Sequence, residues 1–109
     1  MIYVLNTLIV PIDFSKHPQA TVKFTRISVE EARKLLKQQF VSAVGHEATA
    51  NLLSKLLSTP IPANRVTVFM NPGDVGVHFF LRSRIPEGKV LSLEELEKLD
   101  YWLVKSEVL

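Results

Sequence analysis

The hydrophobic and polar positions of this chain follow a strand-like period in some segments and a helix-like period in others. Residues 2–10 are apolar at both alternating sets of positions and rich in β-branched side chains, which is typical of a central strand covered on both faces. After a loop of turn-forming residues, residues 20–27 predict a second strand. Residues 65–70, 75–84 and 101–108 predict further strands. The pattern therefore predicts about five strands in total.

Apolar residues recur at helical spacing in other segments. Residues 28–31 match a capping box, and the helix that begins there is expected to bury Val29, Ala32, Leu35 and Leu36. A second helix is predicted to begin at residues 45–47 and to stop at residues 58–60, where Ser-Thr-Pro interrupts the pattern. Its expected buried residues are Ala48, Leu52, Leu53, Leu56 and Leu57. Residues 92–95 match a capping box again and predict a short helix that ends near Leu99.

Residues 71–74, with the sequence Asn-Pro-Gly-Asp, predict a type II turn, because proline suits the second position of that turn and glycine the third. The turn would join residues 65–70 to residues 75–84 in a hairpin. On one face this register pairs Met70 with Val75, Val68 with Val77, and Val66 with Phe79. The other face would pair Thr67 with His78 and gather three arginines at one end of the hairpin, namely Arg65, Arg82 and Arg84.

These elements predict a single α/β domain over residues 1–109, with a mixed sheet of about five strands and helices mainly on one face. A chain of 109 residues is long enough to bury a core of its own. The opposite face of the sheet would be free. We expect a homodimer to cover it, because two-fold dimers are the commonest closed assembly.

The composition and the absence of known motifs exclude several kinds of functional site. The chain contains no cysteine, which excludes disulfides and thiolate metal sites. Its formal net charge is only +2, too small to make general nucleic-acid binding the default expectation. The apolar N-terminal run stops at Asn6, far short of the roughly 20 residues that span a membrane, so no membrane partner is expected. The glycine-rich nucleotide loops, the serine hydrolase elbow and the two-histidine zinc helix are also absent from the sequence.

His46 follows Gly45 at the predicted start of the second helix. The first turn of a helix presents unpaired N–H groups and a partial positive charge, which together suit a phosphate. Arginine suits the same ligand, because its planar fork forms paired hydrogen bonds with phosphate. From the residues alone, His46 could be a catalyst or a surface residue, and the arginines could bind an anion or lie on a solvated strand face. The spacing of His46 from His17 and His78 indicates no metal site.

Four blocks of the sequence together resemble the small viral anti-CRISPR ring nuclease family. The blocks are residues 3–6, 42–49, 64–66 and 84–95, so their order and spacing extend over nearly the whole chain. The pair Gly-His-Glu-x-Thr and Arg-x-x-Glu-Gly-Lys carries most of the specificity. Members of that family are associated with archaeal viruses and related mobile elements.

The resemblance implies a homodimer that binds cyclic tetra-adenylate, the second messenger of type III CRISPR defence, and cleaves it with neither metal nor cofactor. Carried over by motif, His46 would be the catalytic histidine and Glu87 its supporting carboxylate. The expected ligand-binding residues are Asn6, Gly45, Arg65 and Arg84. The protein would act in the cytoplasm of the infected host cell and silence the host response.

The implied mechanism uses a ribose 2′-hydroxyl as the nucleophile, with His46 protonating the departing 5′-oxygen. The product would be linear di-adenylate ending in a 2′,3′-cyclic phosphate. An alternative of a different class stays open, in which the protein is a non-catalytic viral dimer that binds nucleic acid through its arginine-bearing face. Under that alternative, His46 would be irrelevant to function.

Overall fold

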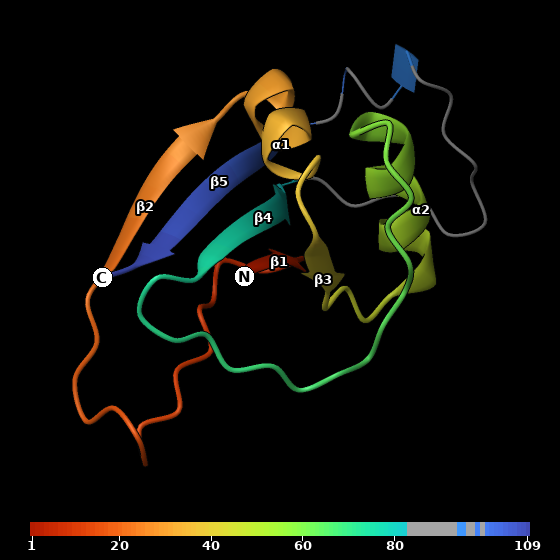
Figure 1. Ribbon diagram of the computed structural model, residues 1–109. Coiled ribbons are helices and arrows are strands. Elements are labelled where there is room, and N and C mark those ends of the chain that lie inside the picture. The colour runs from red at the N-terminus through yellow and green to blue at the C-terminus, as the bar shows by residue number, and fades with distance from the viewer. Residues whose placement is uncertain (83–93, 96–97, 99) are drawn as a thin grey trace.

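The computed structural model describes residues 1–82, 94–95, 98 and 100–109 of the chain. Within these ranges, five strands form one mixed sheet in the order β2-β5-β4-β1-β3, and two helices pack against it (Figure 1). The strands are β1 (Ile2–Leu5), β2 (Val22–Ile27), β3 (Phe40–Ser42), β4 (Val75–Leu81) and β5 (Tyr101–Val108). The helices are α1 (Val29–Leu35) and α2 (Glu47–Leu56). The predicted compact α/β domain with a five-stranded mixed sheet is confirmed.

β1 lies inside the sheet, as predicted, but it is shorter than predicted. It pairs in parallel with β3 on one side and with β4 on the other. β5 is antiparallel to both of its neighbours, β4 and β2. The expected strand over residues 2–10 ends at Leu5 because the backbone bends at residues 6–8.

The predicted hairpin does not form, although its turn does. The Asp74 N–H donates to Asn71 O over 2.9 Å, and Gly73 has a φ of 94°, as a type II turn requires. Residues 65–70 form no strand, and β4 instead pairs with β1 along residues 75–78. The predicted hairpin register is therefore wrong, and so is the pairing that would have brought Arg65 to Arg82, whereas Arg84 lies outside the described residues.

The pairing partner of β4 is decided by burial rather than by the turn. A two-residue turn reverses the chain and would bring residues 65–70 beside β4. A strand with more apolar surface to bury can take that place beside β4 instead. Ile2, Val4 and Leu5 of β1 are all buried, whereas Val66 and Phe69 remain 46% and 48% exposed in the loop before the turn. β3 was not predicted from the sequence, since three residues are too few to establish a period.

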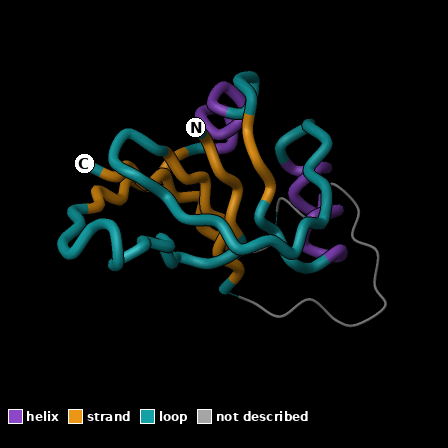
Figure 2. Tube along the Cα trace, turned by 60° about the horizontal axis from the view of Figure 1, so that its bottom comes forward, coloured by secondary structure: helices purple, strands orange, loops and turns teal. Residues whose placement is uncertain are grey.

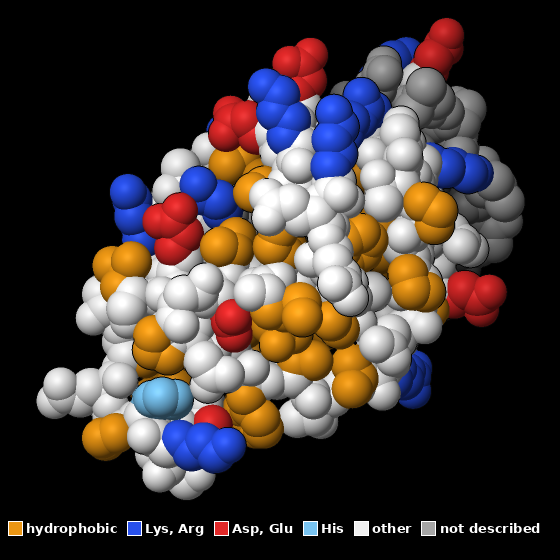
Figure 3. Space-filling view, in the orientation of Figure 1, with side chains coloured by type: hydrophobic (Ala, Val, Ile, Leu, Met, Phe, Trp, Pro, Cys, Tyr) orange, Lys and Arg blue, Asp and Glu red, His pale blue; other side chains and the backbone are white. Residues whose placement is uncertain are grey.

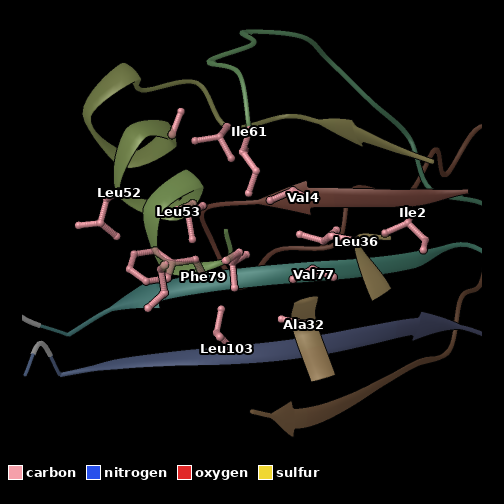
Figure 4. Packing of buried hydrophobic residues seen from close by; sticks show 14 of the residues in the cluster. Ile2, Val4, Ala32, Leu36, Leu52, Leu53, Ile61, Val77, Phe79 and Leu103 are labelled. Atoms are coloured by element: carbon pink, nitrogen blue, oxygen red, sulfur yellow. The ribbon is translucent and has the colours of Figure 1, made fainter. Parts of the chain in front are cut away.

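Both helices cover the same face of the sheet, as expected. The α1 N-cap is Ser28, whose hydroxyl accepts a hydrogen bond from the Glu31 N–H over 3.2 Å, as the capping box predicts. Figure 4 shows Leu36 and Leu53 directed toward the strands that carry Val4, Val77 and Phe79. Of the helical positions predicted to be buried, Val29 and Leu35 of α1 are only partly buried, and Ala48 is exposed in the first turn of α2, where Ala50 is buried instead.

The second face of the sheet is only partly open, in contrast to the expectation. Loop segments cross over the strands there (Figure 2). A smaller core on Leu5, Met70 and Val108 forms beneath residues from these segments, including Val10, Ile12 and Val68. The segment before the turn therefore buries Met70 and partly buries Val68 without becoming a strand.

On the helix-covered face, charged side chains of both signs gather over α1, and hydrophobic side chains extend across the middle (Figure 3). The basic side chains over α1 thus have acidic side chains beside them. In the described part of the chain, no helix has the length and apolar character needed to cross a membrane. The short helix predicted near residues 92–99 falls largely outside the described residues.

Candidate functional site

An open hollow of about 400 Å³ lies beside the start of α2. Asn6 enters it just after the end of β1, and Ala43 just after the end of β3. β1 and β3 are parallel neighbours, so the hollow lies at the carboxyl ends of two parallel strands, which is where α/β sheets usually bind ligands. The lining residues are Asn6, Ala43, Gly45, His46, Arg65, Val66 and Thr67.

His46 is the N-cap residue of α2, as its place in the sequence predicts. Its backbone is extended, with φ −121° and ψ 126°, and its side chain makes no capping hydrogen bond. An N-cap serine or aspartate would use its side chain to satisfy the amides of the first turn. Because His46 does not, the imidazole is exposed to the hollow, and no side chain among the described residues accepts a hydrogen bond from the first-turn amides of α2.

Arg65 is held against the start of α2 by its own side chain. Its Nε–H donates to Gly45 O over 2.9 Å. A Cβ atom at Gly45 would lie 3.4 Å from Arg65 Cγ, so glycine lets the arginine stem lie directly on the backbone. Within the described part of the chain, the terminal guanidinium nitrogens of Arg65 have no hydrogen-bond partner. They can therefore form the paired hydrogen bonds that suit a phosphate.

Asn64 explains how Arg65 reaches the hollow without a hairpin. Its side-chain Nδ2 donates to Ser42 O over 2.8 Å, and its backbone N–H donates to Val44 O over 2.7 Å. Ser42 in turn donates from Oγ to Pro62 O over 2.7 Å. These hydrogen bonds attach residues 62–64 to the end of β3, so that the next residue faces Gly45.

Four of the six site residues predicted from the sequence share this hollow. They are Asn6, Gly45, His46 and Arg65. The other two predicted site residues, Arg84 and Glu87, lie outside the described residues. Thr67, which was predicted to face His78, lines the hollow instead, because the hairpin that would have paired them does not form.

Arg82, which was predicted to join Arg65, has its own partners at the end of β4. Its Nη1 lies 3.3 Å from Asp100 Oδ2, and its guanidinium stands 5.0 Å from the ring centre of Trp102. The ion pair is half exposed and its contribution to stability is small. Arg82 does not line the hollow.

The three histidines occupy separate places. The His17 Nε2 contacts Asn71 Oδ1 at 3.2 Å, and His46 faces the hollow. His78 is fully buried, with its Nδ1 2.7 Å from Thr7 O and its Nε2 2.7 Å from Ser106 Oγ. Burial lowers the pKa of His78 below its usual range. Among the described residues, no group of three or more His, Asp or Glu side chains could hold a metal ion.

The arrangement of the hollow suits an anionic ligand. An arginine fork, the positive end of a helix and an imidazole converge on one open space. The imidazole can donate a proton to an oxygen of a bound ligand, and the other groups can stabilise negative charge on phosphate oxygens. The sequence did not reveal Ala43, Asn64 or Thr67 as part of this arrangement, because the placement of Ala43 depends on the pairing of β3 with β1, and that of Asn64 and Thr67 on the path of residues 60–70.

Comparison with known proteins places these features in a family. A family model described as STIV B116-like matches residues 2–103. The uncharacterized protein ORF117 of Acidianus two-tailed virus is 44% identical over 105 residues, which are 93% of this chain and 87% of that protein. The uncharacterized protein YddF of Bacillus subtilis is 34% identical over 82 residues, 72% of this chain and 76% of that protein. Relatives therefore include a bacterial protein as well as proteins of archaeal viruses.

The solved structure of B116 from Sulfolobus turreted icosahedral virus has the same fold. It superposes with a TM-score of 0.82 over 97% of each chain, at 26% sequence identity. Such a match over nearly all of both chains agrees with the single-domain architecture.

Proposed function

Because this chain belongs to the STIV B116-like family, whose relatives include archaeal virus proteins, we propose that it is a metal-independent ring nuclease. Its substrate would be cyclic tetra-adenylate, and its effect would be to silence type III CRISPR signalling in the cytoplasm of the infected host cell. The observation that carries the proposal is the convergence of His46, Arg65 and the start of α2 on one hollow. This convergence supplies both a proton donor and a phosphate site.

The reaction follows from the placement of these groups. A ribose 2′-oxygen attacks the adjacent phosphorus and releases its proton to solvent, while the bond from phosphorus to the 5′-oxygen breaks. His46 protonates that 5′-oxygen, and such general acid catalysis is worth about 10²- to 10⁴-fold. Arg65 and the first-turn amides of α2 stabilise charge on the non-bridging oxygens. The product is a linear adenylate with a 5′-hydroxyl and a 2′,3′-cyclic phosphate.

The size of the hollow favours a homodimer as the active form. At about 400 Å³ it lies near the lower end of the range for small-molecule sites. One copy would therefore hold only part of a four-nucleotide ring. A two-fold ring facing a two-fold dimer would meet one His46 at each of two opposite phosphates, and two cleavages would give two molecules of di-adenylate. Within this proposal Arg84 adds to the phosphate site and Glu87 supports His46.

The alternative of a non-catalytic nucleic-acid-binding dimer loses the surface on which it depended. That surface was the arginine-bearing face of the hairpin, which does not form. Arg82 is paired with Asp100, and the helix-covered face carries charges of both signs (Figure 3). No observation on the described residues favours this second function.

A cleavage assay in excess EDTA tests the proposal. Purified protein is expected to convert cyclic tetra-adenylate to di-adenylate with EDTA present. His46→Ala should bind the ring with little change but cut it about 10²- to 10⁴-fold more slowly. His17→Ala is the matched control, since this histidine lies outside the hollow beside Asn71, and its rate should be unchanged. Wild-type rates from His46→Ala, or no cleavage by the unmodified protein, would refute the assignment.

A further inference from the structure

We propose that His78 and Ser106 form a buried positioning pair that holds Asn6 in the hollow. The inference rests on the proposed function, because Asn6 matters only if the hollow binds a ligand. Neither His78 nor Ser106 lines the hollow, and both are completely buried. Their effect on the site must therefore pass through the backbone that connects them to Asn6.

The hydrogen bonds fix the direction of this connection. Thr7 O can only accept, so the His78 Nδ1 carries the hydrogen and donates to it over 2.7 Å. Burial lowers the pKa of His78 and so favours the neutral ring, and a neutral ring with its hydrogen on Nδ1 leaves Nε2 as an acceptor. The Ser106 hydroxyl then donates to Nε2 over 2.7 Å. A single ordered chain of hydrogen bonds thus leads from β5 through the ring on β4 to the carbonyl of Thr7.

The spacing of Ser106 and His78 resembles that of a nucleophile and its base, but the pair cannot act in this way. A nucleophile must reach a substrate, and both side chains have no exposed surface. The other ring nitrogen is occupied by a backbone carbonyl. The pair therefore serves the structure around it rather than a covalent reaction.

Gly76 makes room for this pair. Gly76 lies opposite Ser106 in the sheet and precedes His78 by two positions on the same strand. A Cβ atom at Gly76 would overlap Ser106 Oγ and lie 2.6 Å from His78 Nε2. The absence of a side chain at this position therefore lets the ring and the hydroxyl meet in the sheet.

The carbonyl that His78 holds belongs to the bend that carries Asn6. β1 ends at Leu5, which lies beside His78 in the adjacent strand, and residues 6–8 bend away from strand geometry. In this bend Thr7 O is anchored by the His78 ring, and the preceding residue, Asn6, lines the hollow. Fixing the Thr7 carbonyl restricts the backbone on the C-terminal side of Asn6, and so the direction of its side chain.

Two substitutions of His78 separate positioning from simple packing. The amide nitrogen of asparagine is as many bonds from Cα as Nδ1 is, so His78→Asn can keep the donor to Thr7 O. The amide nitrogen of glutamine matches Nε2 instead, so His78→Gln loses that donor and keeps a contact to Ser106. Both variants replace the ring by a smaller amide and cost packing.

Affinity for cyclic tetra-adenylate is measured in a His46→Ala background, where this ligand is expected to stay uncleaved. His78→Gln should weaken binding about threefold to tenfold, as expected for one lost positioning hydrogen bond, and His78→Asn should stay within about twofold. In an Asn6→Ala background the effect of His78→Gln should disappear. Equal losses from both His78 variants, or an undiminished loss without Asn6, would overturn the proposal.

Amide hydrogen exchange in the ligand-free protein tests the same pair without relying on the proposed function. Residues 6–8 should exchange faster in His78→Gln than in the unmodified protein, and His78→Asn should not change them. If His78→Gln does not fold, Ser106→Ala removes the donor to the ring and should speed exchange in the same residues. Unchanged exchange would overturn the positioning role, whereas failure of cyclic tetra-adenylate to bind the unmodified protein would overturn only the proposed function.

Discussion

Replacing Arg65 with lysine would keep a positive charge in the hollow but remove the Nε–H that Gly45 O accepts at 2.9 Å. That hydrogen bond sets the plane of the guanidinium beside the start of α2. Lysine offers a point charge with no planar fork, so it loses both the anchor and the paired contact with phosphate. Hydrogen bonds to charged groups contribute about 1.5–3 kcal/mol, and the exposure of Arg65 argues for the lower end. We therefore expect Arg65→Lys to weaken binding of cyclic tetra-adenylate by about tenfold.

The assay is isothermal titration calorimetry with cyclic tetra-adenylate in the His46→Ala background, at several salt concentrations. Arg82→Lys is the matched control, because this arginine also has a partner, Asp100, but lies outside the hollow. The control should bind within about twofold of the parent, as expected for an exposed pair. Arg65→Gln, which removes the charge as well, should bind more weakly than Arg65→Lys and with a smaller salt dependence. If Arg65→Lys and Arg82→Lys bind equally well, the anchored fork has no role in recognition.

Further predictions concern stability. Because burial lowers the pKa of His78, the unfolded chain binds the extra proton first as the pH falls below about 6.5, so the free energy of unfolding should fall there by at most about 1.4 kcal/mol per pH unit. In urea titrations, the free energy of unfolding of His78→Asn should depend less on pH. The hydrogen bonds to Ser15 lower the pKa of Asp13, so the stability that this carboxylate contributes is lost only as the pH falls below its ordinary pKa of 3.8. Leu53→Ala empties a fully buried position on α2 and should cost about 2–5 kcal/mol by chemical denaturation, against less than about 0.5 kcal/mol for exposed Lys55→Ala. Gly76→Ala should cost about 1–3 kcal/mol and lower the Tm by several degrees, because no space exists for the methyl group; an unchanged Tm would contradict the tight packing.

The sequence predicts the local features of this fold better than its long-range pairings. The Asn71–Asp74 turn and the Ser28 cap form as predicted, because each depends on a few adjacent residues. The partner of β4 could not be inferred in this way, since β1 and residues 65–70 both carry apolar side chains that could face the core, and only burial in three dimensions decides between them. β3 escaped prediction because pairing with β1, rather than any pattern of its own, makes three residues a strand.

In the candidate site, too, local features could be predicted and long-range contacts could not. Gly45 and His46 could be placed from the sequence, because the start of α2 is a local property. The approach of Arg65 to them depends on two hydrogen bonds from Asn64 to the end of β3, which no spacing along the chain encodes. Arg65 is a predicted site residue even though the predicted hairpin is wrong, because the resemblance to the ring nucleases selects it independently of the hairpin.

The place of β5 in the sheet has a consequence for how the protein is made. β5 lies between β2 and β4, and it is the partner through which β2 joins the sheet. During synthesis β1, β3 and β4 can pair as soon as residue 81 is free, but β2 has to wait until residues 101–108 leave the ribosome. Until then Phe24 and its neighbours on β2 present an unpaired edge, which is the state most prone to aggregation. A nascent chain stalled before residue 101 should therefore depend on chaperones, although three of the five strands of its sheet can already pair.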